Sequence, residues 1–116
     1  LTRNRQASRM ARGRLKVADR ARKSQQTELF YEETGKAIWG YLADKLGIEL
    51  SELSREKVSL IIGEKGVEEQ TIEELFRIID DCEFSRYAPS AEKSDPDELY
   101  EQSVKLIRSL EQYIRK

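Results

Sequence analysis

The chain has 116 residues, enough for one domain with one hydrophobic core. Apolar residues make up 38% and charged residues 37%, and this charge content, well above the usual quarter, indicates solvated helix faces. Two prolines and six glycines are too few turn residues for a fold of many β-strands, and no stretch approaches the ~18 apolar residues of a membrane span.

Positive charge is concentrated at the N-terminus. Residues 1–24 contain nine lysines and arginines and a single acid, Asp19, for a net charge of +8, whereas the rest of the chain carries −9. A basic arm joined to an acidic body is typical of a binding segment attached to a folded unit. We therefore predict a basic helical arm over 1–24 and an acidic helical-bundle domain over 25–116 that folds without the arm.

The first predicted helix spans residues 4–24 and has two faces. A thin apolar stripe with a period of three and four residues consists of Ala7, Met10, Ala11, Leu15, Ala18 and Ala21. A basic stripe on another face consists of Arg5, Arg9, Arg12, Lys16, Arg20 and Lys23. This basic stripe has three interpretations: a surface facing an anionic membrane, a solvated or self-docking helix, or a nucleic-acid-binding face. An acidic body would repel nucleic acid, so we expect none as a partner.

Four more helices are expected, over 27–46, 55–65, 68–83 and 96 to about 114. Gly47 and Gly66 are suited to end the first two of them, Ser54 is a good N-cap, and Asp95-Pro96 begins the last, with Glu98 as its capping-box partner. Their inward positions are Phe30, Thr34, Ala37, Ile38, Tyr41, Leu42, Leu46, Val58, Ile61, Ile62, Ile72, Leu75, Phe76, Ile79, Leu99, Leu106, Ile107, Leu110 and Ile114. The predicted fold is all-α, a compact bundle of about five helices with a basic N-terminal helix.

Little in the sequence points to catalysis. Histidine, the commonest general base, is missing, and carboxylates such as Glu68, Glu69, Glu73 and Glu74 follow a helix-start pattern that favours solvated faces. We predict no enzyme activity, catalytic residue, cofactor or metal site. Cys82 is interpreted as a small core residue, with a redox thiol activated by Arg86 as the alternative.

Three segments resemble one known family. They are Phe30-Tyr31 through Ala37 to Trp39-Gly40-Tyr41-Leu42 and Asp44-Lys45-Leu46, then Leu53-Ser54-Arg55-Glu56, and then Cys82-Glu83-Phe84 with Arg86-Tyr87-Ala88-Pro89. Together they resemble the C-terminal cytoplasmic region of BatD, the Bacteroides aerotolerance family, from about Lys16 to Leu110. Two positions differ from the family pattern: Ser85 stands where alanine is expected, and Gly35 where a better helix former is expected.

The resemblance implies a membrane-anchored parent with β-rich periplasmic domains, one membrane helix and this helical tail. In such a protein residues 1–24 would be a basic juxtamembrane-type helix just inside the membrane, as the positive-inside rule predicts. It implies a soluble fragment at the cytoplasmic face of the bacterial inner membrane, in a protein involved in aerotolerance and oxidative-stress resistance. Implied partners are von Willebrand A-type Bat proteins or a MoxR-type AAA+ ATPase. The expected function is a non-enzymatic protein-interaction or assembly domain, and the alternative is a nucleic-acid-binding helical module using the N-terminal Arg/Lys face.

A partner-binding site is predicted at Glu83, Phe84, Arg86 and Tyr87. Two aromatic residues and an arginine within four positions are the residue types that dominate interface hot spots. The alternative is that Phe84 and Tyr87 fold back into the core between the last two helices.

Overall fold

The computed structural model describes residues 2–84 and 95–113, with the side chains of residues 11–83 and 95–113. These residues form five α-helices and one 3-10 turn, and they contain no β-strand. The elements are α1 (Thr2–Lys23), α2 (Thr27–Leu46), η1 (Leu50–Glu52), α3 (Arg55–Glu64), α4 (Glu69–Phe84) and α5 (Pro96–Tyr113). The prediction of an all-α bundle of about five helices is confirmed, and each predicted helix lies within two residues of an observed one.

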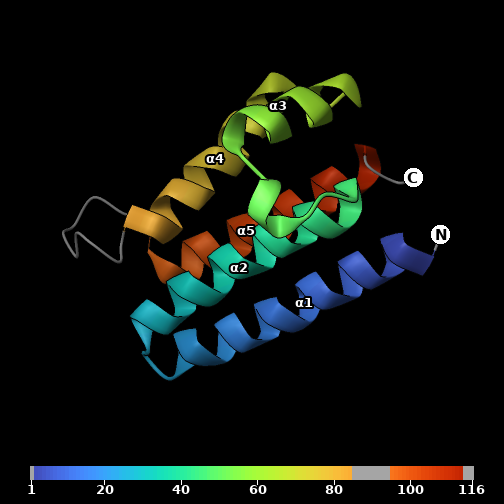
Figure 1. Cartoon of the computed structure of the whole chain (residues 1–116). Helices are drawn as coiled ribbons and strands as arrows, with labels where there is room; N and C mark the ends of the chain where they lie inside the picture. The colour runs from blue at the N-terminus through green and yellow to red at the C-terminus, as the bar shows by residue number, and fades with distance from the viewer. Residues whose placement is uncertain (1, 85–94, 114–116) are drawn as a thin grey trace.

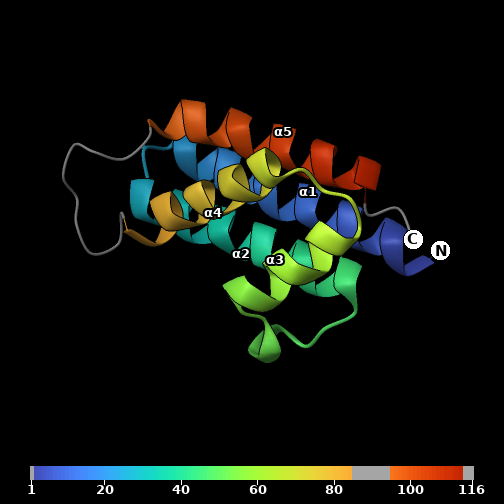
Figure 2. The same ribbon diagram turned by 90° about the horizontal axis from the view of Figure 1, so that it is seen from above.

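Helix α2 is the centre of the bundle, since it contacts α1, α4 and α5. Figure 1 shows α1, α2 and α5 running along one another, with α4 and then α3 above them. The view from above in Figure 2 shows that α4 lies across this layer and that the green turn before α3 projects at one edge of the bundle. This turn contains η1, which contacts α2. Helix α3 packs on α4, so it stands outside the main layer.

The helix ends follow from local chemistry. Ser54 accepts a hydrogen bond from the Lys57 backbone N–H at 3.1 Å, which confirms the predicted N-cap of α3. Gly47 ends α2 in the left-handed conformation at φ 68°, and Gly66 follows α3 at φ 96°, both as expected for glycine after a helix. The Leu99 N–H donates to the Asp95 carbonyl at 2.8 Å, whereas the side-chain capping box of Asp95 stays a prediction.

The core contains most of the predicted inward positions. Fully buried side chains include Phe30, Ile38, Tyr41, Leu42, Val58, Ile62, Leu75, Ile79, Leu99 and Leu110. Ile61 is only half-buried, and Leu46, Ile72 and Phe76 pack against the core from its edge. Predicted Ile114 lies outside the described residues. Helix α3 packs on α4 at the edge of the bundle, where Val58 and Ile62 are buried while Ile61, Ile72 and Phe76 keep part of their surface in contact with solvent.

Helix α1 packs along the length of α2, and four of its apolar residues belong to the same core as the rest: Ala11, Leu15, Ala18 and Ala21. The predicted domain boundary at residue 24 stays a prediction. In the part of the chain that the structure describes, each helix is too short or too polar to cross a lipid bilayer.

Candidate functional site: a basic face and an apolar groove

The outer side of α1 carries the described part of the predicted basic stripe. We call Arg12, Lys16, Arg20 and Lys23 the basic face: all four are exposed, on the side of the helix opposite to its buried alanines and Leu15. Among the described residues, only Lys23 of these four has an acid partner, Asp19, at 3.3 Å. The side chains of Arg5 and Arg9, the other predicted members, lie outside the described residues. Most of the charge on this face is therefore available to an external anion.

Arg22 shows how α1 is oriented. It pairs with Asp19 on its own helix and with Asp97 of α5, and its guanidinium lies 5.0 Å from the centre of the Tyr100 ring. The hydrogen bond from Arg22 holds the pKa of Asp19 below its usual range, so this carboxylate stays charged. Arg22 thus fixes one side of α1 against α5 and leaves the basic face turned away from the bundle.

A second surface feature is an apolar groove of about 580 Å³ beside α2, which we call the Trp39 groove. Four segments line it: α1, α2, the residues around η1, and the end of α4. The lining residues are Arg14, Tyr31, Glu32, Gly35, Lys36, Trp39, Gly40, Leu50, Leu53, Cys82 and Glu83. Trp39 is half-buried and Leu50 is 59% exposed, so the groove places large apolar side chains at the protein surface.

Two glycines of α2 line this groove without side chains that would fill it. A Cβ atom at Gly35 would lie 3.5 Å from the Cys82 Cβ, and one at Gly40 would lie 4.0 Å from the Arg14 guanidinium. Both distances are ordinary contacts, so a methyl group would fit at either position. Glycine inside a helix costs about 1 kcal/mol relative to alanine, and here it leaves space where a longer side chain would fill the groove.

Charged groups around the groove are paired at one end and unpaired at the other. Glu83 lies 3.4 Å from Arg55, and Lys36 lies 3.0 Å from Glu32. Arg14, at the other end, has no acid partner among the described residues. The groove therefore presents one uncompensated positive charge next to an apolar surface.

Cys82 contributes to the groove wall but is only 2% exposed. Burial raises the pKa of its thiol to about 12, with the nearby Asp81 carboxylate as the second cause. A redox thiol would need a lowered pKa. Its burial and the raised pKa therefore favour the interpretation of Cys82 as a core residue.

Of the predicted partner-binding residues, the structure places only one side chain. Glu83 is exposed at the edge of the Trp39 groove. Phe84 ends α4, but its side chain, like the whole of Arg86 and Tyr87, lies outside the described residues. Whether this segment is interface or core stays a prediction. Sequence reasoning missed the groove itself, although Gly35 and Gly40 inside a helix beside a tryptophan were a signal for it.

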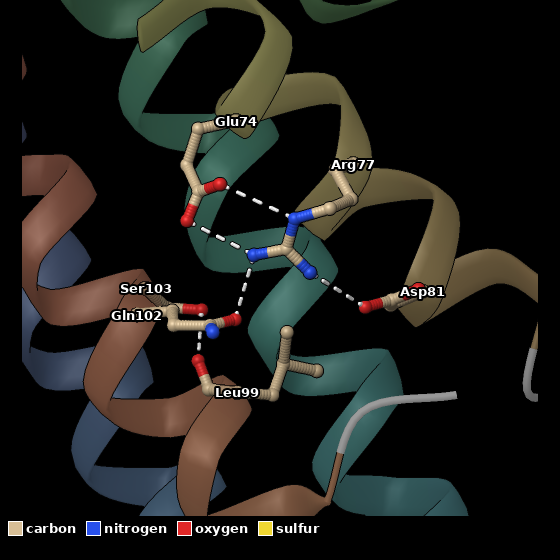
Figure 3. A network of polar contacts seen from close by, with 6 residues as sticks. All are labelled: Glu74, Arg77, Asp81, Leu99, Gln102 and Ser103. Atoms are coloured by element: carbon tan, nitrogen blue, oxygen red, sulfur yellow. Dashed lines mark hydrogen bonds and ion pairs between the residues drawn. The ribbon is translucent and has the colours of Figure 1, made fainter. Parts of the chain in front are cut away.

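The buried and half-buried charges of the body hold helices together. Arg77 of α4 bonds both oxygens of Glu74, reaches Asp81 at 3.2 Å and donates to Gln102 of α5 at 2.8 Å (Figure 3). Hydrogen bonding to Glu74 raises the pKa of Arg77. These contacts link α4 to α5.

A second cluster links α2 to α5. Glu111 accepts a hydrogen bond from the Tyr41 hydroxyl at 2.6 Å and lies 2.7 Å from the Lys45 ammonium, whose side chain is 3% exposed. Burial and this hydrogen bond raise the pKa of Tyr41. Among the side chains described, those of residues 11–83 and 95–113, no three metal-binding groups come together.

The fold and these two surfaces define a class: a small helical bundle with a basic outer helix and an open apolar groove. No protein-family model, curated protein or solved structure matches this chain.

Proposed function

We propose that this chain is a non-enzymatic protein-interaction or assembly domain at the cytoplasmic face of the bacterial inner membrane. It would be the tail of a membrane-anchored BatD-like protein involved in aerotolerance and oxidative-stress resistance, with von Willebrand A-type Bat proteins or a MoxR-type AAA+ ATPase as partners. The proposal rests on the resemblance of the segments around Trp39, Ser54 and Cys82 to that family, and on the surface of α1.

The observation that carries the proposal is the basic face. Arg12, Lys16 and Arg20 lie along one exposed side of α1 with no described acid partner, on a body that is otherwise acidic. Each Lys or Arg near an anionic bilayer contributes about 1 kcal/mol of attraction, which decays within a Debye length of about 8 Å. A membrane would therefore attract α1 and repel the acidic body, so the domain would lie with α1 nearest the lipid and its other surfaces facing the cytoplasm.

Vesicle sedimentation at low ionic strength tests this orientation. We expect the chain to bind vesicles containing phosphatidylserine and not vesicles of phosphatidylcholine alone, with binding lost as salt is raised. The triple variant Arg12→Glu, Lys16→Glu, Arg20→Glu should remove the binding. The matched control changes three exposed lysines of the body, Lys57, Lys65 and Lys105, to glutamate, which alters the net charge equally.

Three results would contradict the proposal. One is the absence of binding to phosphatidylserine vesicles, and another is an equal loss in the basic-face and control variants. The third concerns the nucleic-acid alternative: a salt-dependent gel shift of generic DNA or RNA that the basic-face variant abolishes, without vesicle binding, would favour that function instead.

A further inference from the structure

We propose that the Trp39 groove binds a short segment of a partner protein that places apolar side chains on Trp39 and Leu50 and a carboxylate on Arg14. This inference names the surface that takes the protein partner, and to that extent it rests on the proposed function. It depends on different residues from the basic face, so the two proposals can fail separately.

The apolar part of the inference follows from exposure. Leu50 is 59% exposed, Trp39 is half-buried, and Leu53 packs beside them only partly covered. Scattered single apolar residues on a surface need no explanation, but here they line one groove of about 580 Å³. Tryptophan is among the residue types most enriched in binding hot spots. Covering this groove would remove a continuous apolar surface from water.

The shape fits a short peptide segment. The floor follows α2 from Tyr31 to Gly40, and at 1.5 Å per residue this run is about 14 Å long, or two to three helical turns. Gly35 and Gly40 leave the floor low, so an incoming side chain can approach the α2 backbone. An amphipathic helix laid in an apolar groove uses side chains at this spacing.

The charged residues at the two ends of the Trp39 groove indicate which charge a bound partner segment would carry. Glu32 pairs with Lys36 and Glu83 pairs with Arg55, so these acids already have bases beside them. The Arg14 guanidinium, close to Gly40, is the charge without a described partner. Arginine and carboxylate form two parallel hydrogen bonds when their planes align. A segment with an acidic residue at the Arg14 end therefore complements the groove, and a basic segment does not.

Phage display tests the proposal. A library of random 16-residue peptides without tryptophan is selected for binding to the whole chain. Enriched peptides should combine several apolar residues with an aspartate or glutamate. Their synthetic forms should shift the fluorescence of Trp39, which is the chain's only tryptophan and so reports on the groove directly.

Two pairs of variants locate the binding site. Gly40→Leu should weaken peptide binding by roughly tenfold or more because the leucine fills the groove, whereas Gly13→Leu, at a helix position with nothing within 4 Å, should not. Arg14→Glu should weaken binding by roughly tenfold, whereas Arg12→Glu on the basic face should leave it unchanged and reduce vesicle binding instead. Circular dichroism melts check that each variant is folded.

Four outcomes would overturn the proposal: no enrichment of any peptide, enrichment of basic peptides, equal effects in the members of a pair, or a Trp39 signal that does not respond. Sedimentation of the chain alone should show a monomer. A dimer that Gly40→Leu dissociates would assign the groove to a second copy of the chain and would also overturn it. Loss of vesicle binding in Arg12→Glu with peptide binding intact supports both proposals. Peptide binding without any vesicle binding would contradict the proposed function at the membrane and would leave the proposal for the Trp39 groove standing.

Discussion

Replacing Leu15 by alanine measures how firmly α1 belongs to the bundle. Leu15 is 4% exposed in the core between α1 and α2. The change removes three carbon atoms, worth about 2.4 kcal/mol at ~0.8 kcal/mol each, and leaves a cavity that adds to the loss, so we expect a decrease of about 3 kcal/mol in the free energy of unfolding. An unfolding entropy of about 0.24 kcal/mol/K for a chain of this size converts this loss into a fall in Tm of about 12 °C.

Thermal and urea denaturation followed by circular dichroism provide the assay, with Val17→Ala as the matched control. Val17 lies two residues further along the same helix and is 41% exposed, so its loss should change the free energy of unfolding by less than about 0.5 kcal/mol. A cost below about 1 kcal/mol for Leu15→Ala would refute the reasoning. So would an early, separate melting step, because α1 would then leave the bundle before the body unfolds.

Three other predictions follow from the described contacts. Glu111→Ala should lower the free energy of unfolding, measured in urea, by about 2 kcal/mol, because it removes the acid that pairs with the buried Lys45 ammonium. Glu32→Ala, which removes the acid of an exposed pair, should lower it by less than about 0.5 kcal/mol. Equal losses in the two variants would contradict this prediction. Cys82 should react slowly with thiol reagents in the native state, and because its folded pKa of about 12 exceeds the ordinary 9.0, the unfolded thiol ionises first. The contribution of the neutral Cys82 thiol to the free energy of unfolding is therefore complete below pH 9 and is lost as pH rises towards 12, by at most about 1.4 kcal/mol per pH unit. A Cys82→Ala variant should lack this part of the decline. Fast labelling of Cys82 at neutral pH would contradict its burial. Deleting residues 1–14 should change Tm by only a few degrees, because Ala11 is the one buried side chain described there, and a loss of cooperative unfolding would show that the body needs the whole arm.

Much of the fold could be read from local signals. The cap at Ser54, the left-handed glycine at Gly47 and the proline at the start of α5 each act within one helical turn, so they define where helices begin and end without help from the rest of the chain. The basic face could also be predicted from the sequence, because residues spaced three and four apart lie on one side of any helix.

The sites that depend on packing could not be predicted. Arg22 and Asp97 are 75 residues apart in the chain, and nothing near Arg22 signals that α5 will lie beside it. Gly35 and Gly40 beside Trp39 are a sign of open space in the sequence, but they do not show which other elements complete the groove. Residues of α1, of η1 and of the end of α4 line that groove together with α2, and the position of each element depends on how whole helices pack against one another. The sequence by itself therefore determined the helices and the charged surface of α1, while the tertiary structure alone decided which faces stay open, since packing is settled by contacts between residues far apart in the chain.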